Sequence, residues 1–98
     1  MPFAVMNVVT TTPDEAGVLA VEVERSSFAS LKGQPGFRSA RLYRGEEETE
    51  IVTITEWESR DAFLDYRQSE AGRRAVAGAL AVHPKISFFE IVATLQGA

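Results

Sequence analysis

The chain has 98 residues, of which 45% are hydrophobic and 24% charged, proportions that are typical of one globular domain. It contains no cysteine and a single histidine, which excludes disulfides, zinc–thiolate sites and histidine-rich metal sites. The net charge of −4 repels polyanions, and no apolar run approaches the roughly 20 residues of a membrane span. Residues 1–7 lack the features of a signal peptide. We therefore expect one cytoplasmic domain over residues 1–98, with no bound metal and no nucleic-acid or membrane partner.

The chain begins with a predicted strand and a predicted helix. Residues 3–11 are rich in β-branched and aromatic side chains, which predicts a strand. The sequence Thr12-Pro13-Asp14-Glu15 is a helix-start signal, because the Thr12 hydroxyl can accept from first-turn amides and Glu15 can reach back to Thr12. This helix should run to about Lys32, where the Gly33-Gln34-Pro35-Gly36 breaker begins.

A predicted β-hairpin follows the first helix. Residues 37–44 and 50–57 have the composition of strands, and residues 45–49 between them are too short and polar to form anything but a hairpin loop. Ser59 then opens a second helical region, with Asp61 in its first turn.

The second helical region and a last strand complete the order of elements. Ser69-Glu70 offers a second cap inside the region, so we expect one broken helix, or two, reaching about Val82. Pro84 precedes the last strand, which we predict over residues 85–95. The order β-α-β-β-α-β is the ferredoxin-like α+β arrangement with a four-stranded antiparallel sheet.

Both faces of the predicted sheet carry apolar side chains. In the first strand, one face carries Phe3, Val5 and Val9, and the other carries Ala4, Met6 and Val8. In the last strand, one face carries Ile86, Phe88 and Val92, and the other carries Phe89, Ile91, Ala93 and Leu95. Two helices can cover only one face of such a sheet. A chain of this length also buries only roughly 60–65% of the surface that it exposes when unfolded. We therefore expect a homodimer in which the open sheet faces of two copies pack together.

Several polar and aromatic side chains depart from an ordinary core pattern. They are Asn7, Thr53, Thr55, Trp57, Phe63 and Tyr66. Asn7 shares a strand face with apolar residues, and a buried amide without a partner costs about 1–3 kcal/mol. A pocket between sheet and helices, lined by aromatic rings and a few polar groups, explains these departures together. For each aromatic residue alone, a place in the core or the dimer interface explains it as well.

Three segments carry a family resemblance: Asn7 in the first strand, Pro35-Gly36-Phe37 before the second, and the run from Glu56 to Phe63 that reads EWESRDAF. They resemble the antibiotic biosynthesis monooxygenase domain, a dimeric α/β-barrel of ferredoxin-like protomers. The resemblance implies oxidation of a phenolic or anthrone-type molecule by O₂ without a cofactor. It implies that Asn7 and Trp57 are catalytic and that the aromatic side chains form the substrate wall. Together with Thr53, which shares a strand face with Trp57, the aromatic residues Phe63 and Tyr66 are the substrate-binding residues that we expect.

A second branch of this family degrades haem, so the resemblance makes haem the alternative cofactor. That branch also uses a tryptophan in the second helical region and an axial histidine about ten residues later. Here Tyr66 stands at the tryptophan position and Ala75-Val76 at the histidine position, while His83 comes several residues too late. We therefore predict a homodimeric cofactor-independent monooxygenase acting on an aromatic, quinol-like small molecule and O₂. The alternatives are a haem-degrading monooxygenase and a non-catalytic dimeric small-molecule-binding module, which would pack Trp57 and Tyr66 in a closed core.

Overall fold

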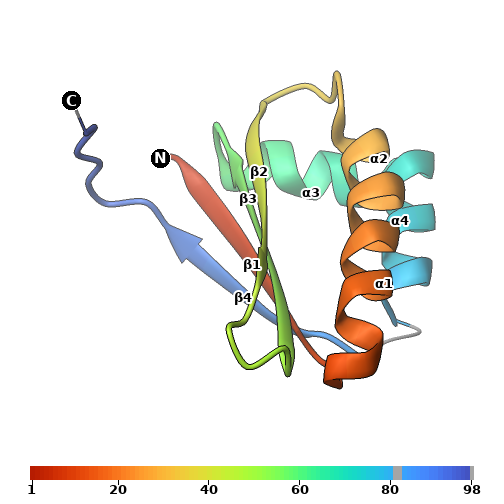
Figure 1. Ribbon diagram of the computed structural model, residues 1–98. Coiled ribbons are helices and arrows are strands. Elements are labelled where there is room, and N and C mark those ends of the chain that lie inside the picture. Colours follow the sequence, from red (N-terminus) through yellow and green to blue (C-terminus); the bar gives the residue numbers. More distant parts are fainter. Residues whose placement is uncertain (81–82, 98) are drawn as a thin grey trace.

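The computed structural model describes residues 1–80 and 83–97, with side chains for all of these except 79 and 80. Four strands form one antiparallel sheet in the order β2-β3-β1-β4: β1 (Phe3–Thr10), β2 (Phe37–Arg44), β3 (Glu50–Trp57) and β4 (Lys85–Glu90). The helical segments are α1 (Pro13–Val23), η1 (Glu24–Phe28), α2 (Ala29–Leu31), α3 (Arg60–Gln68) and α4 (Glu70–Leu80). The helices lie on one side of the sheet (Figure 1). The predicted ferredoxin-like β-α-β-β-α-β fold is confirmed.

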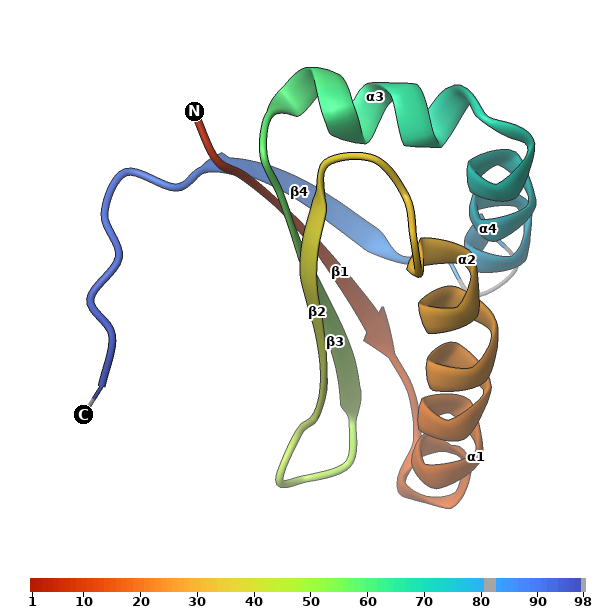
Figure 2. The ribbon, with the colours of Figure 1, turned by 90° about the horizontal axis from the view of Figure 1, so that it is seen from above.

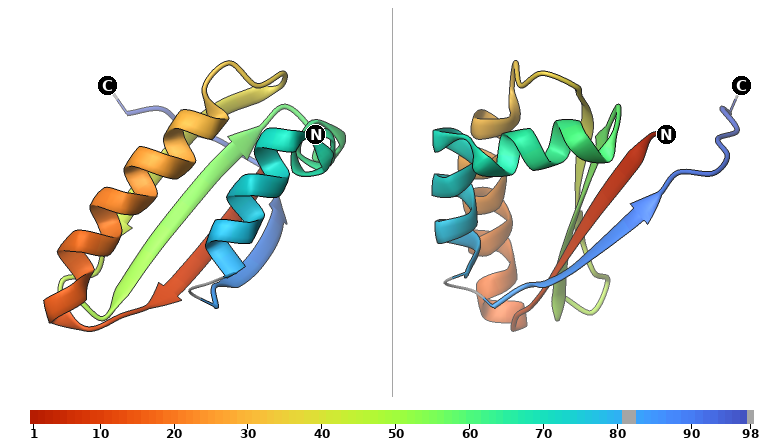
Figure 3. Two further views of the ribbon diagram at one scale, coloured as in Figure 1. Left: turned by 90° about the vertical axis from the view of Figure 1, so that its right-hand side faces the viewer. Right: turned by 180° about the vertical axis from the view of Figure 1, so that it is seen from behind.

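Strand pairing assigns every side chain of the sheet to one of two faces. The helix-facing side carries Phe3, Val5 and Val9 of β1 and Ile51, Thr53, Thr55 and Trp57 of β3, all of them buried. The opposite face, which we call the open face, carries the apolar residues Ala4, Met6, Val8, Tyr43, Val52, Ile54 and Phe89 and the polar residues Ser39, Arg41, Glu56, Lys85 and Ser87. Figures 2 and 3 show that the helices of the described residues all lie on the other side of the sheet, so none of them covers the open face. The described part of the chain therefore leaves this face, with apolar side chains on β1 and β3 in its middle, without cover of its own.

A long helical segment over residues 13–31 crosses the sheet and contains a π-helical turn, η1. The sequence predicts a continuous helix here, because apolar periodicity does not signal the wider turn. Serine hydroxyls bond to carbonyls around that turn: Ser26 Oγ donates to Glu22 at 2.7 Å, and Ser30 Oγ donates to Ser27 at 2.8 Å. Side-chain bonds of this kind compete with the regular α-helical pattern and accompany its local distortion.

Serine caps set the start of both later helices, as predicted. Ser59 Oγ accepts a hydrogen bond from the backbone three residues on at the start of α3, and Ser69 Oγ does the same at the start of α4. Thr12 is the N-cap of α1, but its hydroxyl makes no cap hydrogen bond and only its carbonyl accepts from the first turn. The end predicted at Val82 lies outside the described residues. No helix in residues 1–80 or 83–97 is long and apolar enough to cross a membrane.

The last strand is shorter than predicted, because β4 ends at Glu90 rather than at Leu95. Beyond Glu90, the amide of Ile91 donates to the carbonyl of Pro2 at 2.9 Å, and Pro2 has no amide hydrogen to return. The ladder between β4 and β1 therefore stops here. Residues 91–97 leave the sheet on the side away from α1 and α4 (Figure 2), and Leu95 is 97% exposed.

Candidate functional site

A cluster of aromatic rings lies at the end of the helix-facing side where β3 runs into α3. It consists of Phe3, Phe37, Trp57, Phe63, Tyr66 and Phe88. Trp57 is 0% exposed, and its ring centroid lies 5.7 Å from that of Phe63 and 5.2 Å from that of Tyr66. The structure thus brings together the three aromatic residues that the sequence analysis assigned to the site.

The polar atoms of the two innermost aromatic residues are already bonded within the protein. Trp57 Nε1 donates to Thr55 Oγ1 at 3.0 Å. The Tyr66 hydroxyl lies 2.8 Å from Ser30 Oγ. Because Ser30 gives its single hydroxyl proton to the carbonyl of Ser27, Tyr66 is the donor in that bond. Both polar groups are therefore engaged inside the fold, and the indole is shielded from solvent.

Asn7 lies on the same side of the sheet but at a distance from Trp57. It pairs with Thr53 on β3 and with Ile86 on β4, whereas Trp57 pairs with Phe3. The four positions along β1 that separate the two pairs correspond to about 13 Å. The Asn7 side chain is half-buried, and no side-chain hydrogen bond in the described part of the chain involves its amide. The structure therefore groups Asn7 with Thr53 and leaves the amide available to another molecule.

The sheet surface beside Asn7 is partly accessible, because the helices do not fully cover β4. Ile86 and Phe88 face the helices with Asn7 and Val5, yet they are 41% and 49% exposed. Seen from the helix side, β1 and β3 run between α1 and α4 (Figure 3, left). The sequence assigned Phe88 to a strand face and gave it no functional role. Its exposure depends on where the helices lie, and no local sequence signal predicts that placement.

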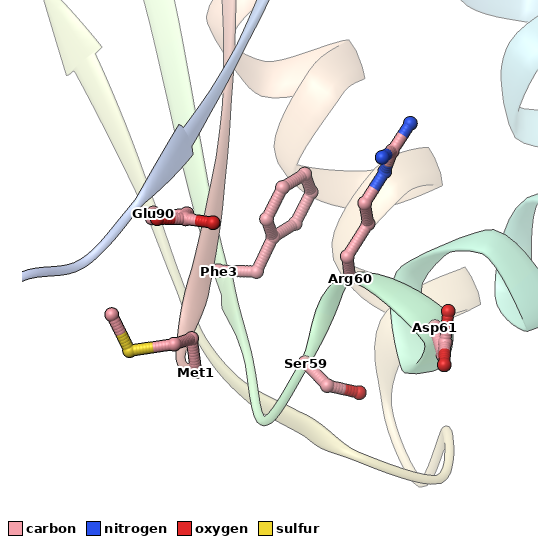
Figure 4. Close-up of a pocket in the computed structure, with 6 residues that line it drawn as sticks. All are labelled: Met1, Phe3, Ser59, Arg60, Asp61 and Glu90. Atoms are coloured by element: carbon pink, nitrogen blue, oxygen red, sulfur yellow. The ribbon is translucent and has the colours of Figure 1, made fainter.

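A depression of about 230 Å³ lies nearby, where β1 starts and α3 begins (Figure 4). It is lined by Met1, Phe3, Ser59, Arg60, Asp61 and Glu90. The ring of Phe3, which also contacts Phe63 and Phe88, projects between Glu90 and Arg60 in this view. The lining includes neither Asn7 nor Thr53. A wider groove of about 610 Å³ runs between α1 and the β2–β3 hairpin, and neither Asn7 nor Thr53 lines it.

The part of α4 where a haem-ligating histidine would be expected carries no histidine. Ala75 and Val76 are half-buried but carry no atom that could ligate iron. His83, the single histidine of the chain, is exposed and has a φ of 51°. Over residues 1–80 and 83–97, no three His, Cys, Asp or Glu side chains come close enough to hold a metal ion.

The order of elements and the four-stranded antiparallel sheet define a class, the ferredoxin-like α+β proteins. The sequence matches the family model for antibiotic biosynthesis monooxygenase over residues 2–78, so the chain belongs to that family. No curated protein sequence matches it.

Solved structures of several proteins share the fold. SnoaB of Streptomyces nogalater, a cofactor-independent oxygenase, is 22% identical with a TM-score of 0.75, and the match covers 98% of each chain. The ActVA-Orf6 monooxygenase of Streptomyces coelicolor, solved with nanaomycin D, is 17% identical with a TM-score of 0.78 over 99% of this chain and 92% of that one. The haem-degrading protein Rv3592 of Mycobacterium tuberculosis is 23% identical with a TM-score of 0.73 over 98% of this chain and 100% of that one. At these identities the likeness shows the fold alone.

Proposed function

We propose that this protein is a cofactor-independent monooxygenase that oxidises an aromatic, quinol-like small molecule with O₂. The observation that carries the proposal is the Asn7 amide on the helix-facing side of the sheet. It is half-buried, it takes part in no side-chain hydrogen bond among the described residues, and it lies beside the partly exposed β4. A single hydrogen-bonding group among apolar neighbours suits a mostly apolar ligand with one reactive oxygen.

For an anthrone-type substrate, the reaction balances without a cofactor. Loss of a ring CH₂ proton to solvent gives an electron-rich anion whose charge is shared with the ring oxygen, and this anion reduces O₂. One oxygen atom forms the new carbonyl, and the other leaves as water with the two CH₂ hydrogens. In this proposal Asn7 Nδ2 donates to the oxyanion, and the bound ring system strengthens that bond by displacing water from this part of the sheet.

Of the other predicted site residues, two contact the substrate in this proposal and two position a residue that does. Thr53, the cross-strand neighbour of Asn7, supplies a second polar contact to the substrate. Phe63 forms part of the substrate wall, since its ring is only half-buried and contacts both Trp57 and Phe88. Trp57 and Tyr66 lie behind Phe63 and hold it in place, so they act through it.

The proposal includes a homodimer formed by packing the open faces of two copies. Met6, Val8 and Ile54 occupy the middle of that face, and Phe89 on β4 is 47% exposed. A contiguous apolar patch on a small domain marks an interaction surface. A second copy presents the same patch, so one two-fold contact buries both.

One observation favours a second candidate, a non-catalytic small-molecule-binding module. Trp57 and Tyr66 are packed and hydrogen-bonded within the core, which is the arrangement that this alternative predicts. The two functions differ in oxygen consumption and not in ligand affinity.

The test is oxygen uptake by the purified protein with a panel of anthrones and hydroquinones. The monooxygenase proposal predicts uptake of one O₂ per anthrone converted to anthraquinone, without added metal or flavin. Saturable ligand binding without any uptake above the protein-free rate would instead establish the binding module.

A further inference from the structure

We propose that Phe88 is an aromatic stacking subsite, the surface on which the planar ring system of the ligand lies while the Asn7 amide holds its oxygen. The inference rests on the proposed function, because it assigns the ring-binding surface of that same site. It concerns a residue that no part of the sequence pattern marked as functional.

Two neighbouring rings hold Phe88 in place. Its centroid lies 6.0 Å from that of Phe3, with an interplanar angle of 18°, and 5.8 Å from that of Phe63, with an angle of 51°. Stacked and tilted contacts of this kind are favourable aromatic geometries. Phe88 is nevertheless 49% exposed, so it is supported by the cluster and still presents aromatic surface to solvent. A ring fixed in this way loses little conformational freedom when a ligand stacks on it.

The position of Phe88 relative to Asn7 follows from the register of β1 and β4. Asn7 lies opposite Ile86, and Phe88 is two residues further along β4 on the same side of the sheet. Diagonal neighbours across an antiparallel pair are about 7–8 Å apart. A planar ligand that lies on Phe88 can therefore extend its edge, with a ring oxygen, to the amide of Asn7. Ile86, which lies directly opposite Asn7 and is 41% exposed, would contact the ring system at its Asn7 end.

The adjacent residue, Phe89, provides a matched control. It has the same side chain and nearly the same exposure, 47% against 49%, but it faces the opposite side of the sheet. A general effect of removing an exposed phenylalanine from β4 would appear at both positions. An effect of a helix-facing stacking subsite would appear at Phe88 alone.

The experiment is a titration with 1,8-dihydroxyanthraquinone, followed by quenching of Trp57, the single tryptophan of the chain. We expect Phe88→Leu to raise the Kd by about 2- to 13-fold, the range that aromatic pairing contributes. Phe88→Tyr, which keeps the ring, should retain the wild-type Kd. Phe89→Leu should retain it too, and light scattering checks that this variant, whose side chain lies in the proposed dimer contact, has the oligomeric state of the wild type. Thermal unfolding of each variant verifies that it is folded. If Phe88→Leu does not fold, Phe88→Met takes its place, because methionine also removes the ring but fills the space with a flexible apolar side chain.

Three results would overturn the inference: an unchanged Kd for Phe88→Leu, an equal loss for Phe89→Leu, or no saturable binding by the wild-type protein. The oxygen-uptake assay distinguishes failure of the stacking subsite from failure of the proposed monooxygenase function. If the wild type consumes O₂ and Phe88→Leu changes neither Kd nor KM, the stacking subsite is rejected and the monooxygenase proposal stands. If the wild type consumes no O₂ but Phe88→Leu binds the ligand more weakly, the stacking subsite stands and the monooxygenase proposal is rejected.

Discussion

The indole Nε1 of Trp57 donates a 3.0 Å hydrogen bond to the hydroxyl of Thr55, two residues earlier on the same strand and the same face. Both side chains are buried, with 0% and 7% of their surface exposed. An indole N–H in such a place needs an acceptor, and the neighbouring strand positions supply only backbone and apolar groups. Thr55 therefore satisfies the Trp57 N–H that the surrounding aromatic rings cannot.

Replacing Thr55 with valine should destabilise the fold by about 1–3 kcal/mol, because the buried indole N–H then lacks an acceptor. Thr53→Val is the matched control: Thr53 is on the same strand face and 8% exposed, and it makes no bond to the indole. Urea denaturation monitored by Trp57 fluorescence measures both variants. Equal changes in the free energy of unfolding would show that the Trp57–Thr55 bond contributes nothing specific.

The strands show how far local sequence patterns predict this fold. The bounds of β2 and β3 agree with the prediction, because a short polar loop separates two runs of strand-forming residues. The prediction for the last strand extended to Leu95, since residues 91–95 are equally suited to a strand. Pairing ends at Glu90 because of the Pro2 position on the neighbouring strand, which is a tertiary relationship and leaves no mark within β4.

At the candidate site, the sequence pattern predicts which side chains group together but not how exposed each one is. The pattern identified Trp57, Phe63 and Tyr66 as a group, and the structure places them in contact. It could not separate the enclosed Trp57 from the half-exposed Phe88, because exposure depends on how the helices lie over β4. Nor could it show that Asn7 lies beside Thr53 and away from Trp57, since that requires the register between β1 and β3.

A charge placed in the middle of the open face should abolish the proposed homodimer. Ile54 lies between Met6 and Arg41 on that face, so Ile54→Lys would place a second cation beside Arg41 in the dimer interface. Light scattering should give twice the chain mass for the wild type and a monomer for this variant. Val18→Lys, at a 65% exposed position on α1, should stay dimeric because α1 covers the other face of the sheet. A monomeric wild type would contradict the dimer.

Hemin should not bind as it does to a protein with a proximal histidine. Ala75 and Val76 of α4 offer no ligating atom, and His83 is exposed beyond the helix. Titration should therefore show no saturable Soret shift at one haem per protomer. A saturable shift that His83→Ala abolishes would restore the haem-degrading alternative.

The oxygen-uptake rates of Asn7 variants decide whether the Asn7 amide is the hydrogen-bond donor of the site. Loss of one donor to a developing oxyanion lowers kcat by about 10²- to 10³-fold. Asn7→Ala should show a loss of this order, and Asn7→Asp, which keeps the shape but repels an anion, should show at least as much. Both variants should melt near the wild-type temperature, because no side-chain hydrogen bond of Asn7 is present among the described residues. Rates equal to the wild type in both folded variants would contradict the assignment.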